Sequence, residues 1–118
     1  MAKNKILLIG GGQIGGNLAL LAAQKELGDI IIYDIPQAEG MIKGKALDIL
    51  QLRPHDGYDV NISGSSNPED MKDSDVVIIT AGMPRKPGMN REDLLSINIK
   101  IISDVANNVK KYAPNAFV

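Results

Sequence analysis

Short apolar runs alternate with longer helical patterns along the whole of this 118-residue chain. Four apolar runs predict strands, at residues 6–9, 30–33, 60–62 and 76–79. The last run has no polar alternation, which is typical of a strand covered on both faces. Three segments with helical periodicity predict helices, at residues 15–27, 41–52 and 92–112. Strand alternating with helix implies right-handed βαβ units, so we expect an α/β fold in which an open parallel sheet carries helices on both faces.

Each predicted helix has an apolar side that should face the sheet. In the first helix this side holds Leu18, Leu21 and Ala22, and Gly28 is expected to stop the helix. The apolar side of the second helix carries Ile42, Ala46, Ile49 and Leu50. In the third helix, which ends before Pro114, it carries Leu94, Ile97, Ile101, Val105 and Val109.

The sequence closes with residues 116–118, "AFV", which read as the first residues of a fifth strand. A sheet edge and apolar helix surface would then be left uncovered. We therefore expect the chain to be the first part of a larger protein, with the fold truncated at the start of the fifth strand.

Three glycines stand between the first predicted strand and the first predicted helix. Gly10, Gly12 and Gly15 have the spacing G-x-G-x-x-G. The first permits a tight turn, the second lets a pyrophosphate approach the backbone, and the third lets helix pack close to strand. A pyrophosphate would then lie on free N–H groups at the positive end of the helix. The pattern predicts a dinucleotide-binding turn of the Rossmann type.

An acidic residue ends the second predicted strand. Asp34 follows Gly15 by nineteen positions (34 − 15), the distance at which an acid accepts hydrogen bonds from a ribose 2′-hydroxyl. A carboxylate there repels a 2′-phosphate, so NAD is favoured over NADP. The alternative is that Asp34 only caps a turn before Pro36.

The loop after the fourth predicted strand holds two arginines. The strand ends in the small residues Thr80–Gly82, and Arg85 and Arg91 follow in "MPRKPGMNRED". In a doubly wound sheet this loop lies beside the ligand crevice. Because a guanidinium pairs bidentately with a carboxylate, two arginines indicate a substrate with two carboxylates. The alternative is a solvated basic loop.

Composition excludes several other classes of function. Thirteen basic and fourteen acidic residues give a net charge of −1, which argues against a nucleic-acid or membrane-surface partner. There is no cysteine and a single histidine, His55, so we expect no metal site. No apolar segment is long enough to span a bilayer, and the amino terminus does not read as a signal peptide. We expect a cytoplasmic protein.

Five stretches together resemble a known family: "LLIGGGQIGG", "YDI", "GKALDI", "DVVIITAGMPRKPGMNREDLLSIN" and "KKYAPNAFV". They are similar to the N-terminal half of NAD-dependent malate dehydrogenases of the lactate-dehydrogenase-like type. The resemblance implies that residues 1–118 form the NAD-binding Rossmann domain of an enzyme that transfers hydride between NAD and malate or oxaloacetate. It also implies a homo-oligomer and an enzyme of the tricarboxylic acid cycle.

The resemblance assigns roles to individual residues. It places Arg85 on a loop that closes over the site, where it selects a dicarboxylate, and Arg91 at the reacting carbonyl. Asn98 would contact both the substrate and the nicotinamide end of the cofactor. The other cofactor-binding residues that it implies are Gly10, Gly12, Gln13, Ile14, Gly15, Asp34, Thr80, Ala81 and Gly82.

The resemblance also implies residues that this chain does not contain. In the family a histidine held by an aspartate transfers the proton, and a further arginine grips the substrate, all in a C-terminal catalytic domain absent here. We therefore expect no catalytic residue in this chain, and His55 has no positioned partner that would give it such a role. Glu92 and Asp93 are interpreted as charges at a helix amino end.

Three alternatives remain open from sequence. The first is a lactate or other 2-hydroxyacid dehydrogenase. The second is a non-catalytic nucleotide-binding fragment. The third is a sugar-nucleotide or other NAD enzyme that shares only the glycine pattern, and the arginine loop speaks against it.

Overall fold

A four-stranded parallel sheet forms the centre of the molecule in the computed structural model, which describes residues 3–118. The strands are β1 (Lys5–Ile9), β2 (Asp29–Tyr33), β3 (Ile62–Ser65) and β4 (Val76–Ile79). Their order across the sheet is β3-β2-β1-β4, so the order reverses between β1 and β4. The predicted Rossmann-type doubly wound fold is confirmed.

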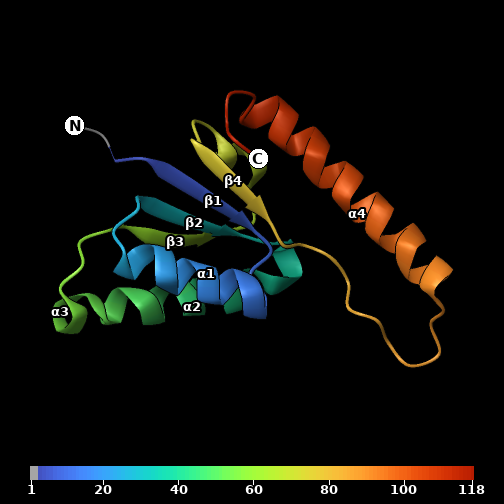
Figure 1. The fold of residues 1–118 in the computed structure, drawn as a ribbon, viewed down its shortest axis with the longest axis horizontal. Coiled ribbons are helices and arrows are strands. Elements are labelled where there is room, and N and C mark those ends of the chain that lie inside the picture. Colours follow the sequence, from blue (N-terminus) through green and yellow to red (C-terminus); the bar gives the residue numbers. More distant parts are fainter. Residues whose placement is uncertain (1–2) are drawn as a thin grey trace.

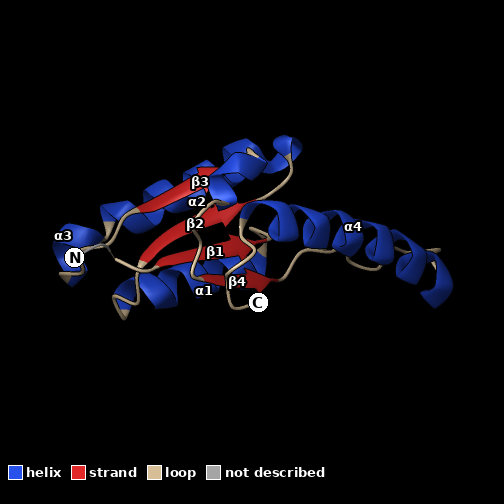
Figure 2. Cartoon of the chain, turned by 90° about the horizontal axis from the view of Figure 1, so that it is seen from above, coloured by secondary structure: helices blue, strands red, loops and turns tan. Residues whose placement is uncertain are grey.

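Helices cover both faces of the sheet (Figures 1 and 2). They are α1 (Gln13–Gln24), α2 (Glu39–Gln51), the short α3 (Arg53–Asp56) and α4 (Arg91–Tyr112), with 3-10 turns at Pro36–Ala38 and Pro68–Met71. Residues 3–118 contain no helix that combines the length and apolar content needed to cross a membrane.

The strand pleat divides the core into two layers. Alternate strand residues such as Leu8 and Ile32 pack with α1 and α2 on one face, whereas Leu7 and Ile9 pack with α4 on the other. All four of these side chains are almost fully buried. Strand β1, at the centre of the sheet, therefore has a layer of helix to pack against on each side.

Helix α1 meets the sheet through small residues. Gly15, Ala19 and Ala23 are its buried positions. The prediction that Leu21 faces the core is wrong, because its side chain is 51% exposed. Small residues let the helix approach the strands more closely than a leucine would allow. The helix also ends earlier than predicted, at Gln24, and Glu26 takes the left-handed conformation with φ of 52°.

Strand β3 lies further along the chain than its apolar residues predict. It spans Ile62–Ser65 and pairs with β2 from Ile30 to Tyr33. At Gly64 a β-carbon would stand 2.7 Å from the Lys43 amide nitrogen, so β3 and α2 approach through bare backbone. This close approach explains why a strand of small polar residues forms here.

Strand β4 matches its predicted bounds but is not covered on both faces along its length. Val77 is buried against α4, whereas Ile78 on the other face is 36% exposed. Phe117 forms a parallel bridge with Val76 and exchanges backbone hydrogen bonds with Asp75 and Val77 at 2.9 and 2.8 Å. The predicted fifth strand is represented by this single bridge, which lies beside β4 at the end of the order β3-β2-β1-β4.

Helix α4 packs on the sheet with its second half only. Val105 and Val109 are buried, while Leu94, Ile97 and Ile101 on the same side are half-buried. Figures 1 and 2 show the reason, because the amino end of α4 projects beyond the carboxyl edge of the sheet. The predicted helix and its apolar side are confirmed.

A capping box begins α4 where the helix has little packing to support it. The Asn90 side chain accepts a hydrogen bond from the Asp93 amide at 2.8 Å, and Asp93 accepts from the Asn90 amide at 3.4 Å. The interpretation of Asp93 as a charge at the helix amino end is confirmed, and Glu92 lies in the same first turn.

Asn90→Ala is expected to lower the free energy of unfolding by about 1 kcal/mol, because it leaves amides of the first turn without an acceptor. Urea denaturation measures this change. Asn107→Ala, an exposed position within the same helix, is the control and should be neutral or slightly stabilising. Equal losses for the two variants would contradict a role for the cap.

Candidate functional site

A crevice of about 500 Å³ opens at the carboxyl edge of the sheet, where the strand order reverses. Its walls come from the ends of β1, β2 and β4, from the loop after β4 and from one side of α4. The lining residues are Ile9, Gly10, Gly12, Tyr33, Asp34, Ile35, Met41, Thr80, Ala81, Gly82, Met83, Pro84, Lys86, Ile101 and Val105. Ligands of open α/β sheets bind at this place.

Two glycines let α1 approach the ends of β1 and β4. Gly10 has φ of 110°, and a β-carbon on it would stand 2.7 Å from the Ala81 amide nitrogen. A β-carbon on Gly15 would stand 1.8 Å from the Gly10 carbonyl oxygen. Both sites therefore require glycine, as the predicted turn does.

The amino end of α1 is open towards an anion. Gly12 is its N-cap residue, and no side chain among residues 3–118 caps it or places an acid in its first turn. Gly12 also lines the crevice, and a β-carbon there would meet no atom within 4 Å among the described residues. The helix dipole and the free amides favour a negatively charged ligand.

Asp34 directly follows β2 and lies beside this glycine turn. Its Oδ2 accepts a hydrogen bond from the Gly11 amide and its Oδ1 from the Ile35 amide, each at 2.8 Å. A carboxylate has about four acceptor positions, so each oxygen retains capacity for a hydroxyl. The turn-capping alternative and the ribose-binding prediction are therefore compatible.

An apolar wall continues from Asp34 into the crevice. Ile35 and Met41 line it, and their side chains are 58% and 47% exposed. Tyr33 stands beside them, and burial, followed by the charge of Asp34, raises the pKa of its phenol. The hydroxyl is therefore neutral at physiological pH. This wall suits a flat, weakly polar group next to a hydroxylated one.

The loop after β4 is fastened at its two ends. At the first end, the Asn98 side chain accepts from the Met83 amide at 2.8 Å and donates to the Met83 carbonyl at 3.3 Å. The capping box of α4 fixes the other end. Between them Arg85 is exposed, and its Nε donates to the Met89 carbonyl at 3.3 Å.

The structure brings some of the predicted site residues together and leaves others apart. Gly10, Gly12, Asp34 and residues 80–82 share the crevice, and Gly15 underlies it. Among residues 3–118, the predicted residues that do not line the crevice are Gln13, Ile14, Gly15, Arg85, Arg91 and Asn98. Gln13 faces the groove between α1 and α2, and Ile14 is 66% exposed.

Arg85 and Arg91 stay outside the crevice because the loop that carries them leads away from the sheet (Figure 1). Arg91 is the first residue of α4, at the end that projects beyond the sheet. Lys86, between the two arginines, does line the crevice. The base of the loop is thus fixed at Met83, while the two arginines lie outside the crevice.

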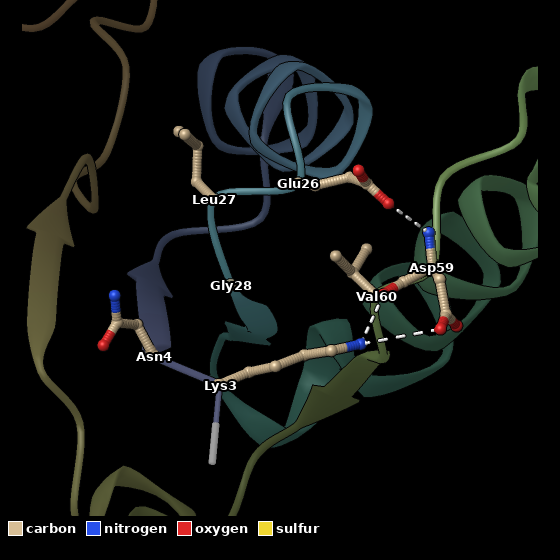
Figure 3. Close-up of a pocket in the computed structure, with 7 residues that line it drawn as sticks. All are labelled: Lys3, Asn4, Glu26, Leu27, Gly28, Asp59 and Val60. Atoms are coloured by element: carbon tan, nitrogen blue, oxygen red, sulfur yellow. Dashed lines mark hydrogen bonds and ion pairs between the residues drawn. The ribbon is translucent and has the colours of Figure 1, made fainter. Parts of the chain in front are cut away.

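A second hollow, of about 440 Å³, lies at the opposite edge of the sheet (Figure 3). The charged side chains of Lys3, Glu26 and Asp59 in this hollow already have partners within it. Lys3 donates to the Asp59 carbonyl and lies 4.0 Å from the Asp59 carboxylate, while the Asp59 amide donates to Glu26 at 2.9 Å. This pairing is structural and leaves the crevice as the candidate site.

His55 lies in α3, which follows the end of α2 at the edge of the sheet away from the crevice (Figure 1). The prediction that it has no positioned partner is wrong, since its Nδ1 lies 2.9 Å from Asp56 Oδ1. That hydrogen bond lowers the pKa of Asp56. The imidazole is exposed at the surface and remote from the crevice.

Sequence reasoning missed the apolar lining and one cation. Ile35 and Met41 gave a usable signal, because they flank the turn directly after Asp34. Lys45 gave a weaker one. It lies one turn after Met41 on α2, and its Nζ reaches the glycine loop at 2.7 Å from the Gly11 carbonyl oxygen.

Comparison with known proteins agrees with this geometry. Residues 4–118 match the family model described as lactate/malate dehydrogenase, NAD binding domain. A malate dehydrogenase from Myxococcus xanthus is 69% identical over 116 residues, which are 98% of this chain and 37% of that protein.

Two solved structures extend the comparison. The malate dehydrogenase of Cryptosporidium parvum has a TM-score of 0.89 and 53% identity, covering 100% of this chain and 37% of that one. The lactate dehydrogenase of the same organism, in complex with lactic acid and the cofactor, has a TM-score of 0.90 and 45% identity, with the same coverage. The chain thus spans a little over a third of the length of these relatives.

Proposed function

This chain belongs to the lactate/malate dehydrogenase family as an NAD-binding domain, and from that premise we propose that the whole protein transfers hydride between NAD and malate or oxaloacetate. The observation that carries the proposal is the crevice itself. It joins an uncapped helix amino end at Gly12 to a carboxylate, Asp34, across one glycine turn. The names of the Myxococcus xanthus relative and of the Cryptosporidium parvum structure with 53% identity favour malate dehydrogenase over lactate dehydrogenase.

The residues present fit the cofactor. The free amides after Gly12 suit a pyrophosphate, and Asp34 keeps acceptor capacity for a ribose hydroxyl. Ile35 and Met41 offer apolar surface for an adenine ring. When bound, NAD supplies the hydride chemistry, while the protein orients the reacting groups and excludes water.

We assign substrate binding to the arginine loop. Arg85 would pair with the second carboxylate of the substrate, and Arg91 would stabilise negative charge on the reacting oxygen. Both side chains start from an exposed position, so the loop must close to bring them to the crevice. Its fastened base, where Asn98 holds Met83, supports a closure confined to the residues between Met83 and Asn90. Asn98 would have to exchange these hydrogen bonds to contact the nicotinamide.

The test is the specificity of the protein at its natural length. We expect kcat/KM for oxaloacetate with NADH to exceed that for pyruvate by about 10³-fold, because a site built for a second carboxylate rejects a substrate that lacks it. NADPH should be a poor substitute, since Asp34 repels a 2′-phosphate. A higher value with pyruvate would favour the lactate dehydrogenase alternative. Binding of NADH without turnover of either substrate would favour a nucleotide-binding module.

Three further assignments belong to the same proposal. They are a homo-oligomeric state, a cytoplasmic location and a place in the tricarboxylic acid cycle. The exposed apolar side chains of α4, Leu95, Ile99 and Ile102, support further packing on this helix. Whether another part of the protein or a second copy covers them is measured by the mass of the protein in solution.

A further inference from the structure

Lys45 lies within α2, yet its ammonium reaches the glycine loop at the amino end of α1. Nζ donates to the Gly11 carbonyl oxygen at 2.7 Å and to the Gly12 carbonyl oxygen at 3.0 Å. The side chain is half-buried and passes over Gly16, where a β-carbon would stand 3.4 Å from its Cδ and Nζ. A glycine at this position therefore leaves room for the lysine to reach the loop.

The lysine approaches the loop from the side away from the crevice. It lines the groove between α1 and α2 together with Gln13 and Asn17, and it is not among the described residues that line the crevice. In a trans peptide the C=O of one residue and the N–H of the next point in opposite directions. By holding the Gly11 carbonyl, Lys45 turns the Gly12 amide away from α2, and Gly12 lines the crevice.

The same loop is held from a second direction. Asp34 accepts a hydrogen bond from the Gly11 amide at 2.8 Å, so both polar groups of Gly11 have a charged partner. Consecutive glycines are otherwise free to adopt many backbone conformations. A loop fixed before the ligand arrives does not have to be ordered on binding, which raises affinity.

We propose that Lys45 is a positioning residue for the phosphates of the ligand. It orients the Gly12 and Gln13 amides towards a pyrophosphate. Its hydrogen bonds to the carbonyl oxygens of the same two peptides also polarise these amides. Its own charge lies close enough to favour the anion without touching it. The inference rests on the proposed function in one respect, namely that the natural pyrophosphate is that of NAD.

The test compares Lys45→Met with Lys45→Arg in the protein at its natural length. Dissociation constants are measured for inorganic pyrophosphate, NADH and adenosine. Lys45→Met should weaken binding of pyrophosphate and NADH by about tenfold, because it removes both charge-assisted hydrogen bonds that order the glycine loop. Adenosine, which has no phosphate, should change by less than about twofold, and Lys45→Arg should recover most of the loss. Lys43→Met is the control, because Lys43 pairs with the exposed Glu39 on the same helix.

The outcomes separate this inference from the proposed function. Unchanged affinity of Lys45→Met for pyrophosphate overturns the positioning role, and so does an equal loss for pyrophosphate and adenosine. If the wild type binds pyrophosphate in a Lys45-dependent way but does not bind NADH, the dehydrogenase proposal fails and the role of Lys45 stands. If the wild type binds neither ligand, both fail. Should Lys45→Met not fold, Lys45→Gln takes its place, and failure of both to fold shows a structural role instead.

Discussion

Gly15→Ala is expected to lower the free energy of unfolding by about 3 kcal/mol, which is a large loss for the addition of one methyl group. The new β-carbon would stand 1.8 Å from the Gly10 carbonyl oxygen, so α1 and the glycine turn would have to move apart. Gly10 cannot yield easily. Its amide donates to the Tyr33 carbonyl at 2.8 Å. Because it has no side chain, its backbone also lies directly against the Ala81 backbone. Because the shift displaces the amino end of α1, NADH binding should weaken as well.

Urea denaturation and NADH titration of the natural-length protein measure the two effects. Gly44→Ala is the matched control, because it makes the same substitution within α2 at a position where a β-carbon meets no described atom within 4 Å. It should stabilise the protein by about 0.5–1 kcal/mol through helix propensity alone. If Gly15→Ala were as stable as Gly44→Ala, α1 could shift on the sheet without cost and the third glycine would have no packing role.

The sequence predicted best what local chemistry determines. Strand β4 matched its predicted bounds because Val76–Ile79 is an unbroken apolar run. The carboxylate of Asp34 fell at the end of β2, where the distance from Gly15 had placed it. Asp93 lies in the first turn of α4, where it was expected as a charge at the helix amino end, and its part in the capping box is a finding of the structure.

What the sequence could not predict depends on close approach between distant segments. Strand β3 was placed too early, at residues 60–62, because Ser63 and Gly64 have low strand propensity. The strand forms there because the Gly64 backbone contacts α2. Leu21 was assigned to the core because it is apolar, whereas small residues such as Ala19 are needed where α1 lies against the sheet. In both cases the apolar pattern was misleading, because the helix lies so close to the sheet that only small residues fit between them.

The arginine loop is a different case, because neither of its arginines lines the crevice in this structure. The sequence supplied both guanidinium groups and the glycine at 88, which has φ of 86°. The contacts that fix its base join residues distant in sequence, as the hydrogen bonds between Asn98 and Met83 show. The residue types thus predict a substrate class, while contacts between residues distant in sequence decide where the two guanidinium groups lie.

Arg85→Gln is expected to lower the ratio of kcat/KM for oxaloacetate to that for pyruvate by about 100-fold or more. Once the loop closes, the guanidinium would pair with a desolvated carboxylate, and removing one member of such a pair costs about 2–5 kcal/mol. Pyruvate has no second carboxylate and loses nothing comparable, so the variant should use it as well as or better than the wild type. Arg85 is suited to this exchange because its side chain is exposed and its single hydrogen bond among the described residues, to the Met89 carbonyl, is long at 3.3 Å.

Two further variants on the same loop separate geometry from charge. Arg85→Lys keeps the positive charge but loses the planar fork, so its ratio should fall between those of the wild type and Arg85→Gln. Lys86→Gln removes the neighbouring charge, which lines the crevice. It should raise KM for both substrates to a similar extent and change the ratio by less than about threefold. Steady-state kinetics with NADH at fixed ionic strength gives all three ratios. If the ratio of kcat/KM for oxaloacetate to that for pyruvate is the same in Arg85→Gln and the wild type, substrate specificity is determined elsewhere in the protein. The crevice would then bind the cofactor, and the arginine loop would have another role.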